Sequence, residues 1–174
     1  MTILSDADIR KALRSGDIKI VPQPAEDQIG AGSVDVALSN EFYILKASVK
    51  KGKIHDLKEI EFDDLFEQVV SDAVILKPNE MILAKTLERI TLAPNICGWI
   101  QGRSKYARLG ITAHVASSFI QPGSDNRQVL EVVNLSPVQV RLHAGMRICQ
   151  IVFEKTESKA TKPYSKFGKT FAKQ

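Results

Sequence analysis

The sequence predicts one mainly β domain, built as a barrel or jelly roll. About ten short segments rich in Val, Ile, Leu and Phe follow one another, and clusters of Gly, Pro, Asn and Asp separate them as turns separate strands. With 174 residues the chain is long enough to bury a sizeable core. No internal repeat and no linker divides it.

The N-terminal segment departs from this pattern, because it predicts a short helix. Ser5 can cap the helix, and Asp8 completes a capping box with Asp in place of Glu. Ile9 and Leu13 form an apolar stripe, and Gly16 ends the helix. The strands that follow are expected at residues 18–20, 33–38 and 42–45.

Residues 62–70 are ambiguous, and their apolar spacing favours a short helix. A second small helix is expected at residues 104–108. The remaining strands are expected at residues 73–76, 81–86, 90–92, 96–100, 110–115, 117–120, 128–134, 137–142 and 146–153. Residues 1–154 would then form the barrel domain, and residues 155–174 a C-terminal arm.

The composition favours a globular protein with a small anionic ligand. Hydrophobic residues make up 44% and charged residues 25%, and the net charge is +4. Several of the lysines lie in the last twenty residues, where they form either a solvated tail or an arm that folds over phosphates. Aromatic residues are 6% and no basic stripe is interleaved with them, so a nucleic-acid partner is disfavoured.

The first residues lack the features of a signal peptide, and no apolar run approaches the ~20 residues of a membrane span. A cytoplasmic location without a membrane partner is therefore expected. Cys97 and Cys149 lie in apolar surroundings and have no partner at CxxC spacing. They are expected to be buried small hydrophobes rather than zinc ligands.

Residues 102–110 (GRSKYARLG) combine two arginines, a hydroxyl and two glycines. A turn opening into a short helix, with guanidinium groups nearby, is suited to binding an anion. The alternative is an ordinary basic surface turn, and the segment by itself does not decide between them.

Glu131 lies in the middle of an apolar strand, on the same predicted face as Val129 and Val133. Burying a carboxylate costs several kcal/mol unless it has partners or a function. If Glu131 faces an interior or interface cavity, its pKa is expected to rise, and it could shuttle protons. The alternative is an edge strand with Glu131 in solvent.

The histidines and short motifs of the chain give weaker indications of a catalytic site. His114 lies on a predicted strand and could act as a base, although a lone strand histidine is more often structural. The three histidines show no metal-ligand spacing. Neither a G-x-S-x-G nucleophile motif nor a Walker motif occurs.

At these residues the chain resembles the dCTP deaminase branch of the trimeric dUTPase superfamily. GRSKYARLG matches the signature GRSSLARLG, IQPG at 120–123 matches IDPG, and LEVVN at 130–134 matches LELSN. The opening MTILSDADI, the strand SVDVAL at 33–38, and Pro163-Tyr164 followed by Gly168-Lys169 are also similar to family blocks. The blocks keep their order and spacing over nearly the whole chain.

The resemblance implies a distorted jelly-roll β-barrel of the dUTPase-like type, assembled as a homotrimer with active sites between subunits. It implies a deaminase without zinc, which agrees with the missing H-x-E and P-C-x-x-C signature. Mg²⁺ would be bound through the triphosphate rather than by a protein cage.

Residue roles follow from the same resemblance. Glu131 matches the catalytic glutamate, which would activate a water for attack on C4 of cytosine. Ser104 and Arg108 would hold the water and the ring region, with Arg108 also orienting Glu131. Arg103 would bind phosphate across the subunit interface. The further substrate-binding positions are Lys105, Ala116, Ser117, Gln121, Tyr164 and Lys169, the last two closing over the phosphates.

The chain departs from the family pattern at several positions. Gln121 stands where the family has Asp, and a glutamine cannot act as a base for dUTP hydrolysis, although it can still hydrogen-bond a sugar hydroxyl. Ser124 replaces an aromatic residue, Asn126 a glycine, and Thr170 a tyrosine of the arm.

The expected function is deamination of dCTP to dUTP and ammonia, with dTTP as a possible inhibitor acting near Ala116-Ser117. One alternative is a bifunctional deaminase–diphosphatase giving dUMP, or a plain dUTPase. Another is a nucleotide-binding trimer without catalysis. Gln121 discriminates between the enzymatic alternatives, and ammonia release separates the enzymes from the binding protein.

Overall fold

The computed structural model describes residues 2–49 and 54–166 of the chain. Its elements in chain order are β1 (Thr2–Ile3), α1 (Asp6–Ser15), β2 (Ile18–Val21), η1 (Glu26–Gln28), β3 (Val34–Leu45), α2 (Phe62–Leu65), β4 (Phe66–Val70), β5 (Ala73–Leu76), β6 (Met81–Leu92), β7 (Ile96–Gly102), α3 (Ser104–Ala107), β8 (Ile111–Thr112), β9 (Phe119–Ile120), β10 (Asp125–Asn134), β11 (Val140–His143), β12 (Arg147–Lys155) and η2 (Tyr164–Lys166).

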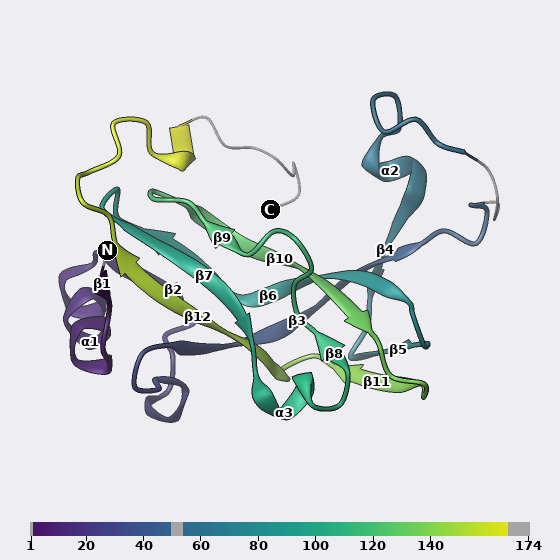
Figure 1. Cartoon of the computed structure of the whole chain (residues 1–174), viewed down its shortest axis with the longest axis horizontal. Coiled ribbons are helices and arrows are strands. Elements are labelled where there is room, and N and C mark those ends of the chain that lie inside the picture. Colours follow the sequence, from purple (N-terminus) through teal and green to yellow (C-terminus); the bar gives the residue numbers. More distant parts are fainter. Residues whose placement is uncertain (1, 50–53, 167–174) are drawn as a thin grey trace.

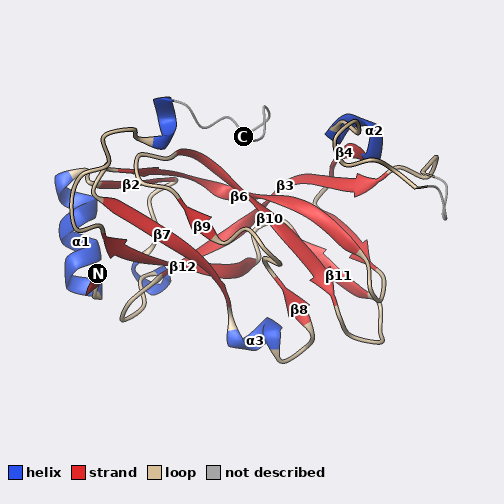
Figure 2. Ribbon diagram, turned by 45° about the horizontal axis from the view of Figure 1, so that its top comes forward, coloured by secondary structure: helices blue, strands red, loops and turns tan. Residues whose placement is uncertain are grey.

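Most strands belong to one strongly curled sheet, as Figures 1 and 2 show. Its main path runs β8-β10-β6-β3-β12-β7-β9, and β1, β2 and β4 pair with members of that path. The strands β5 and β11 form a separate two-stranded sheet. The core inside the curl is aliphatic, with Val34, Ile90, Leu130 and Ile151 fully buried. The prediction of a mainly β barrel-like fold is confirmed.

The N-terminal helix forms for the predicted reasons. The side chain of Ser5 accepts a hydrogen bond from the backbone N–H of Asp8, and the Asp8 carboxylate accepts one from the Ser5 backbone. Gly16 ends the helix with φ of 80°, a left-handed conformation that costs glycine no Cβ clash. Ile9 is fully buried against the sheet.

Several strand boundaries differ from the prediction. Residues 34–45 form the single strand β3 and residues 81–92 the single strand β6, where two strands each were expected. Register shifts within the ladders let both strands continue past the polar residues that had suggested turns. Conversely, the expected strands at 110–115 and 117–120 shrink to β8 and β9, because the residues between them form a loop.

Residues 62–70 are half helix and half strand, since α2 leads directly into β4. Phe62 and Phe66 stack with ring centroids 4.9 Å apart, which holds α2 close to the strand that follows it. Cys97 and Cys149 are free and buried, as predicted. None of the helices in the described ranges is long and apolar enough to span a membrane.

Candidate functional site

Glu131 lies near the centre of β10, between the fully buried residues Leu130 and Val132. The alternation along β10 turns these two neighbours into the core and turns Glu131 to the opposite face, next to Leu83 of β6 in register. There the half-buried Glu131 side chain lines a cavity of about 360 Å³, which we call the Glu131 cavity. The carboxylate therefore faces a cavity rather than open solvent.

Three consecutive backbone N–H groups hold the Glu131 carboxylate. Those of Val115, Ala116 and Ser117 donate to its Oε2 at 2.8, 2.7 and 3.3 Å. All three donors belong to the loop between β8 and β9, so this loop curls around the carboxylate instead of continuing as a strand. The other oxygen, Oε1, accepts no hydrogen bond from any described residue and is available to a water or ligand.

This geometry corrects the expected direction of the Glu131 pKa. Burial by itself raises the pKa, as the sequence analysis assumed, but the donors on Ala116, Val115 and Ser117 stabilise the charged form and lower it below the ordinary value of 4.5. Glu131 is accordingly a carboxylate at neutral pH. It can accept a proton from a water at Oε1.

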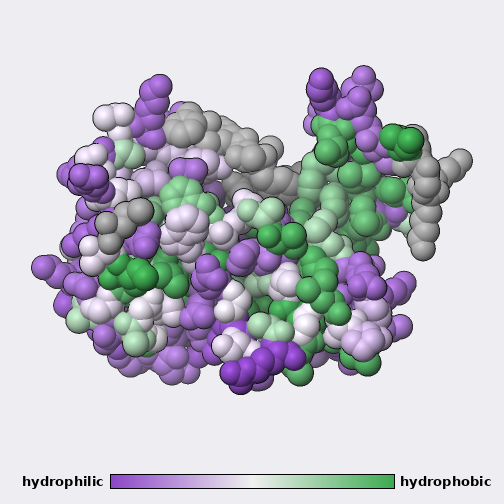
Figure 3. Space-filling model, viewed as in Figure 1, coloured by the Kyte–Doolittle hydropathy of each residue, from purple (hydrophilic) through white to green (hydrophobic). Residues whose placement is uncertain are grey.

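The walls of the Glu131 cavity come from segments far apart in the sequence. Phe62 of α2 and Tyr164 of η2 contribute to it, and Figure 1 shows these two short helices on either side above β10. Apolar residues gather around α2 and β4 at the upper right of Figure 3, whereas the surface around η2 at the upper left is mainly polar. Among the residues of the described ranges that line this cavity, Glu131 alone has a charged side chain.

The beginning of the C-terminal arm is docked on the turn before β10. The N–H groups of Tyr164 and Ser165 donate to the carbonyls of Pro122 and Gly123, both at 3.0 Å. Gly123 has φ of +77°, and a Cβ there would lie 2.4 Å from the Cβ of Pro163, so only glycine lets the arm come this close. This contact places Tyr164 at the rim of the Glu131 cavity. Lys169 lies outside the described residues.

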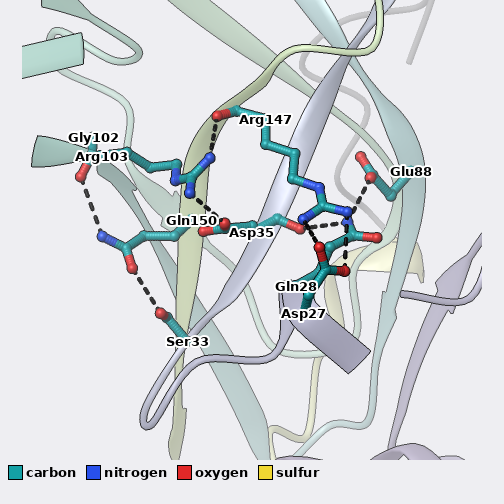
Figure 4. A network of polar contacts seen from close by, with 9 residues as sticks. All are labelled: Asp27, Gln28, Ser33, Asp35, Glu88, Gly102, Arg103, Arg147 and Gln150. Carbon is teal, nitrogen blue, oxygen red and sulfur yellow. Dashed lines mark hydrogen bonds and ion pairs between the residues drawn. The ribbon is translucent and has the colours of Figure 1, made fainter. Parts of the chain in front are cut away.

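Arg103 belongs to a different cavity of about 300 Å³, here called the Arg103 cavity, which Ser104 and Lys105 also line. Its guanidinium forms an ion pair with Asp35 at 2.8 Å and donates to the carbonyl of Arg147 at 2.7 Å. Arg147 in turn makes a two-point ion pair with Asp27, at 2.8 and 3.1 Å. Figure 4 shows this network of charged side chains.

Gln150 fixes the turn that carries Arg103. Its Nε2 donates to the carbonyl of Gly102 at 3.2 Å, and its Oε1 accepts from Ser33 at 2.6 Å. Beside this network the nearly buried Glu88 accepts from the backbone N–H of Ala37 at 2.9 Å. Burial raises the pKa of the Glu88 carboxyl, and the hydrogen bond from Ala37 opposes that rise.

The other polar residues of the 102–110 segment, Ser104, Lys105 and Arg108, are exposed. Ser104 begins α3, a helix of only four residues, so its dipole adds little to anion binding. Lys105 lies over the ring of Tyr106 at 5.4 Å. Arg108, at the end of α3, lines neither the Glu131 cavity nor the Arg103 cavity.

Within one chain the structure therefore divides the predicted site residues into two sets. Glu131, Ser117, Gln121 and Tyr164 line the Glu131 cavity, whereas Arg103, Ser104 and Lys105 line the Arg103 cavity, and no residue lines both. Ala116 contributes its backbone N–H to Glu131. The predicted contact between Arg108 and Glu131 is not made among the described residues of a single chain.

Sequence reasoning missed several residues of the Glu131 cavity. Phe62, Leu83, Phe119, Asn126 and Gln128 line it. The alternation of the strand gave no signal for Gln128, because it has the same parity as the core residues Leu130 and Val132. Nothing local marked Phe62, because it reaches the cavity through tertiary packing. Across residues 2–49 and 54–166, no group of three or more His, Cys, Asp or Glu side chains is arranged to hold a metal ion.

Comparison with known proteins finds a family model described as dCTP deaminase-like, which matches residues 3–156. A protein of Methanopyrus kandleri named "dCTP deaminase, dUMP-forming" is 40% identical over 172 residues, covering 95% of this chain and 88% of the relative. A protein of Thermomicrobium roseum named "dCTP deaminase" is 39% identical over 177 residues, covering 99% and 89%.

Solved structures show the same fold. A 2′-deoxycytidine 5′-triphosphate deaminase from Agrobacterium tumefaciens superposes with a TM-score of 0.69 at 21% identity, covering 88% of this chain and 48% of that one. A dUTPase from phage phi11 of S. aureus gives a TM-score of 0.53 at 11% identity over 87% of this chain. Because both identities are below 25%, the two solved structures support the fold assignment alone.

Proposed function

The chain belongs to the dCTP deaminase-like family, and we propose that it catalyses the hydrolytic deamination of dCTP to dUTP and ammonia. The observation that carries the proposal is the Glu131 carboxylate, which three backbone N–H groups hold by one oxygen in a cavity whose other described side chains are uncharged. A fixed carboxylate with one available oxygen is suited to act as a general base.

In the proposed reaction a water donates one proton to Oε1 of Glu131, and its oxygen attacks C4 of the cytosine ring. The resulting tetrahedral carbon bears both the hydroxyl and the amino group. The electron pair of the C4–N3 double bond moves onto N3 as the water oxygen bonds to C4. Protonated Glu131 then gives its proton to the amino nitrogen, the bond from C4 to that nitrogen breaks and ammonia leaves as the electron pair on N3 re-forms the double bond to C4. Glu131 transfers the hydroxyl proton to N3, which leaves the carbonyl and the N3–H of uracil. The backbone donors on Oε2 keep Glu131 oriented through both proton transfers.

The proposal places each active site between two chains of a homotrimer. Glu131 and the groups that would hold the water and ring, Ser104 and Arg108, are separated in one chain. Because α3 and the adjoining turn are exposed, a neighbouring chain can present them to the Glu131 cavity. Arg103 and Lys105 would then meet the phosphates from that neighbour.

The triphosphate would carry Mg²⁺ itself. Asp35 and Asp27, the carboxylates of the Arg103 cavity, already form ion pairs with Arg103 and Arg147, which leaves the ion to the phosphate oxygens. Bound there, Mg²⁺ would neutralise charge on the phosphates. Tyr164 and Lys169 are proposed to close over the phosphates, and dTTP to compete through the loop at Ala116-Ser117.

A second candidate is continued hydrolysis of dUTP to dUMP. The name of the Methanopyrus kandleri relative favours it. Gln121 argues against it, because its neutral amide lines the Glu131 cavity where the family pattern has an aspartate able to activate water. The main proposal is therefore release of dUTP.

The test is incubation with dCTP, with and without Mg²⁺, followed by quantification of ammonia, dUTP and dUMP. We expect ammonia and dUTP in equal amounts. Glu131→Gln should lower the rate by about 10²–10⁴-fold, because general base catalysis is lost while dCTP still binds. Accumulation of dUMP would instead support the second candidate.

The control is Glu67→Gln, since Glu67 is an exposed carboxylate of β4. It should leave the rate unchanged. Binding of dCTP without ammonia release by the unaltered protein would contradict the proposed function and favour a non-catalytic nucleotide-binding trimer. Normal turnover by Glu131→Gln would contradict the proposed mechanism.

A further inference from the structure

Glu88 of β6 is a buried carboxylate that the proposed reaction does not use. Its residue is only 3% exposed. The ladder between β6 and β3 ends at the pair Leu38–Thr86, and Glu88 lies two residues beyond it, where β6 continues with β2 and β10 as its partners. Because a carboxylate loses its hydration at such a position, it must have partners in the protein.

Two polar backbone groups of β3 lose their strand partner at the same point. The N–H of Ala37 and the carbonyl of Asp35 lie on the same edge of β3, since alternate residues of a strand bond to the same side. The Ala37 N–H donates to Oε2 of Glu88 at 2.9 Å. Gln28, which Figure 4 shows between Glu88 and Asp35, donates from Nε2 to the Asp35 carbonyl at 2.9 Å and to Oε1 of Glu88 at 3.5 Å. Glu88 and Gln28 therefore take the place of a neighbouring strand.

The same stretch of β3 carries the carboxylate that holds Arg103. Val34 and Val36 are fully buried in the core, so the Asp35 side chain between them points to the opposite face. That carboxylate forms the ion pair with Arg103 at 2.8 Å. The position of Arg103 therefore depends on how firmly the backbone at residues 35–37 is held, and Glu88 holds one edge of it.

The charge of Glu88 acts on the same network. A neutral side-chain oxygen could accept the Ala37 N–H, so a buried carboxylate is costly there unless its charge has a further effect. Burial raises the pKa of Glu88, the Ala37 N–H opposes that rise most, and the Arg147 cation also opposes it. The carbonyl of Arg147 accepts from Arg103 at 2.7 Å. Glu88 thus acts on both residues that hold Arg103, namely Asp35 and Arg147.

We propose that Glu88 is a positioning residue, which fixes the backbone of β3 so that Asp35 holds Arg103 in the orientation that binds the phosphates of the substrate. This inference rests on the proposed function, in which Arg103 meets the triphosphate. Glu88 is not among the residues that line the Arg103 cavity, so it acts through Asp35 rather than by touching the substrate.

The experiment is a double-mutant cycle of Glu88→Leu and Arg103→Ala, with KM and kcat for dCTP as the readouts. We expect Glu88→Leu to raise KM by about tenfold, the order of one lost charge-assisted hydrogen bond, and to change kcat by less than about twofold. Added to Arg103→Ala, the same substitution should raise KM no further, because the residue through which Glu88 acts is gone. Glu88→Gln, which keeps an acceptor for the Ala37 N–H, should raise KM less than Glu88→Leu.

The matched control is Glu80→Leu. The Glu80 carboxylate also accepts a backbone N–H, that of Lys77 at 2.8 Å, but Glu80 lines neither the Glu131 cavity nor the Arg103 cavity. This variant should keep the normal KM and kcat. Urea unfolding shows whether each variant is folded. If Glu88→Leu is not, the cycle is carried out with Glu88→Gln, whose smaller rise in KM should also vanish in the Arg103→Ala background.

An equal rise in KM with and without Arg103 would show that Glu88 acts on the fold in general and would overturn the inference, as would a fall in kcat alone. Calorimetric binding of dCTP to the same proteins repeats the cycle as Kd, without turnover. If the unaltered protein binds dCTP and releases no ammonia, the proposed function fails, while non-additive Kd values still support the role of Glu88. Additive Kd values together with normal release of ammonia overturn the inference alone.

Discussion

The Glu131 cavity and the Arg103 cavity hold their charged groups by different means. Glu131 is held by main-chain N–H groups of one loop, and the other residues that line its cavity within the described part of the chain are uncharged. Arg103 is held by two other segments, through the side-chain carboxylate of Asp35 and the main-chain carbonyl of Arg147. The first arrangement leaves one oxygen of the carboxylate available for proton transfer, whereas the second fixes a cation by pairing it.

In the proposed function, this difference means that one chain carries two separate halves of an active site. Glu131 would act as the base in one half, where the nucleoside would bind, and the cations of the other half would bind the phosphates. Main-chain N–H groups stabilise the charged form of the carboxylate without a neighbouring cation. The proposed trimer joins the two halves from neighbouring chains.

Complementation between two inactive variants tests whether neighbouring chains share an active site, and it has the largest expected effect. Glu131→Gln and Arg108→Ala should each be inactive, because each removes one half of every site. Co-expressed in equal amounts, they should regain about a quarter of the normal activity, since a site with both native halves forms at random at that frequency in a closed ring. Turnover of dCTP per chain is the measurement.

Co-purification through two different affinity tags provides the control that mixed assemblies exist. Mixed assemblies without activity would show that both halves must come from one chain, which would contradict the shared site.

The Asp35→Asn substitution tests what the ion pair with Arg103 contributes to stability and to substrate binding. Removing the carboxylate leaves the partly buried Arg103 guanidinium without its ion pair, so the free energy of unfolding should fall by about 1–2 kcal/mol. KM for dCTP should also rise more than kcat falls, because Arg103 loses its orientation. Urea unfolding and steady-state kinetics measure the two effects.

The control is Asp72→Asn, which changes an exposed aspartate. It should alter neither the free energy of unfolding nor KM for dCTP. An Asp35→Asn variant as stable as this control would show that the ion pair contributes nothing to the fold.

The smallest expected effect concerns the pH dependence of stability at Glu131. Burial raises the Glu131 pKa, but the backbone donors outweigh it and place the pKa below 4.5 in the folded chain. A lowered carboxyl pKa stabilises the fold above the unfolded-state pKa, and this contribution is lost as the pH falls through the folded-state value. The stability of the unaltered protein relative to Glu131→Gln should therefore decrease on acidification below about pH 5.

Urea unfolding of both proteins over a pH series measures this difference. If the unaltered protein instead becomes more stable relative to Glu131→Gln as the pH falls, the Glu131 pKa is raised, as the strand pattern alone predicts.

Local sequence patterns predicted much of the framework. The capping box at Ser5 and Asp8, the end of α1 at Gly16 and the burial of both cysteines depend on neighbours in sequence, and all three are confirmed. The predictions of secondary structure were wrong where contacts with distant segments of the chain determine the conformation. The loop at 113–118 was expected to be strand, but its N–H groups bond to the Glu131 carboxylate instead of a neighbouring strand.

The mainly β class, the inward and outward alternation around Glu131 and the family motifs could be predicted from the sequence, because they depend on periodicity and on short blocks of residues. The direction of the Glu131 pKa, the separation of Arg103 from Glu131 and the presence of Phe62 and Gln128 at the cavity emerged from the three-dimensional arrangement. A pKa or a cavity depends on which groups meet in space, and the curl of the sheet brings together residues that no local pattern connects.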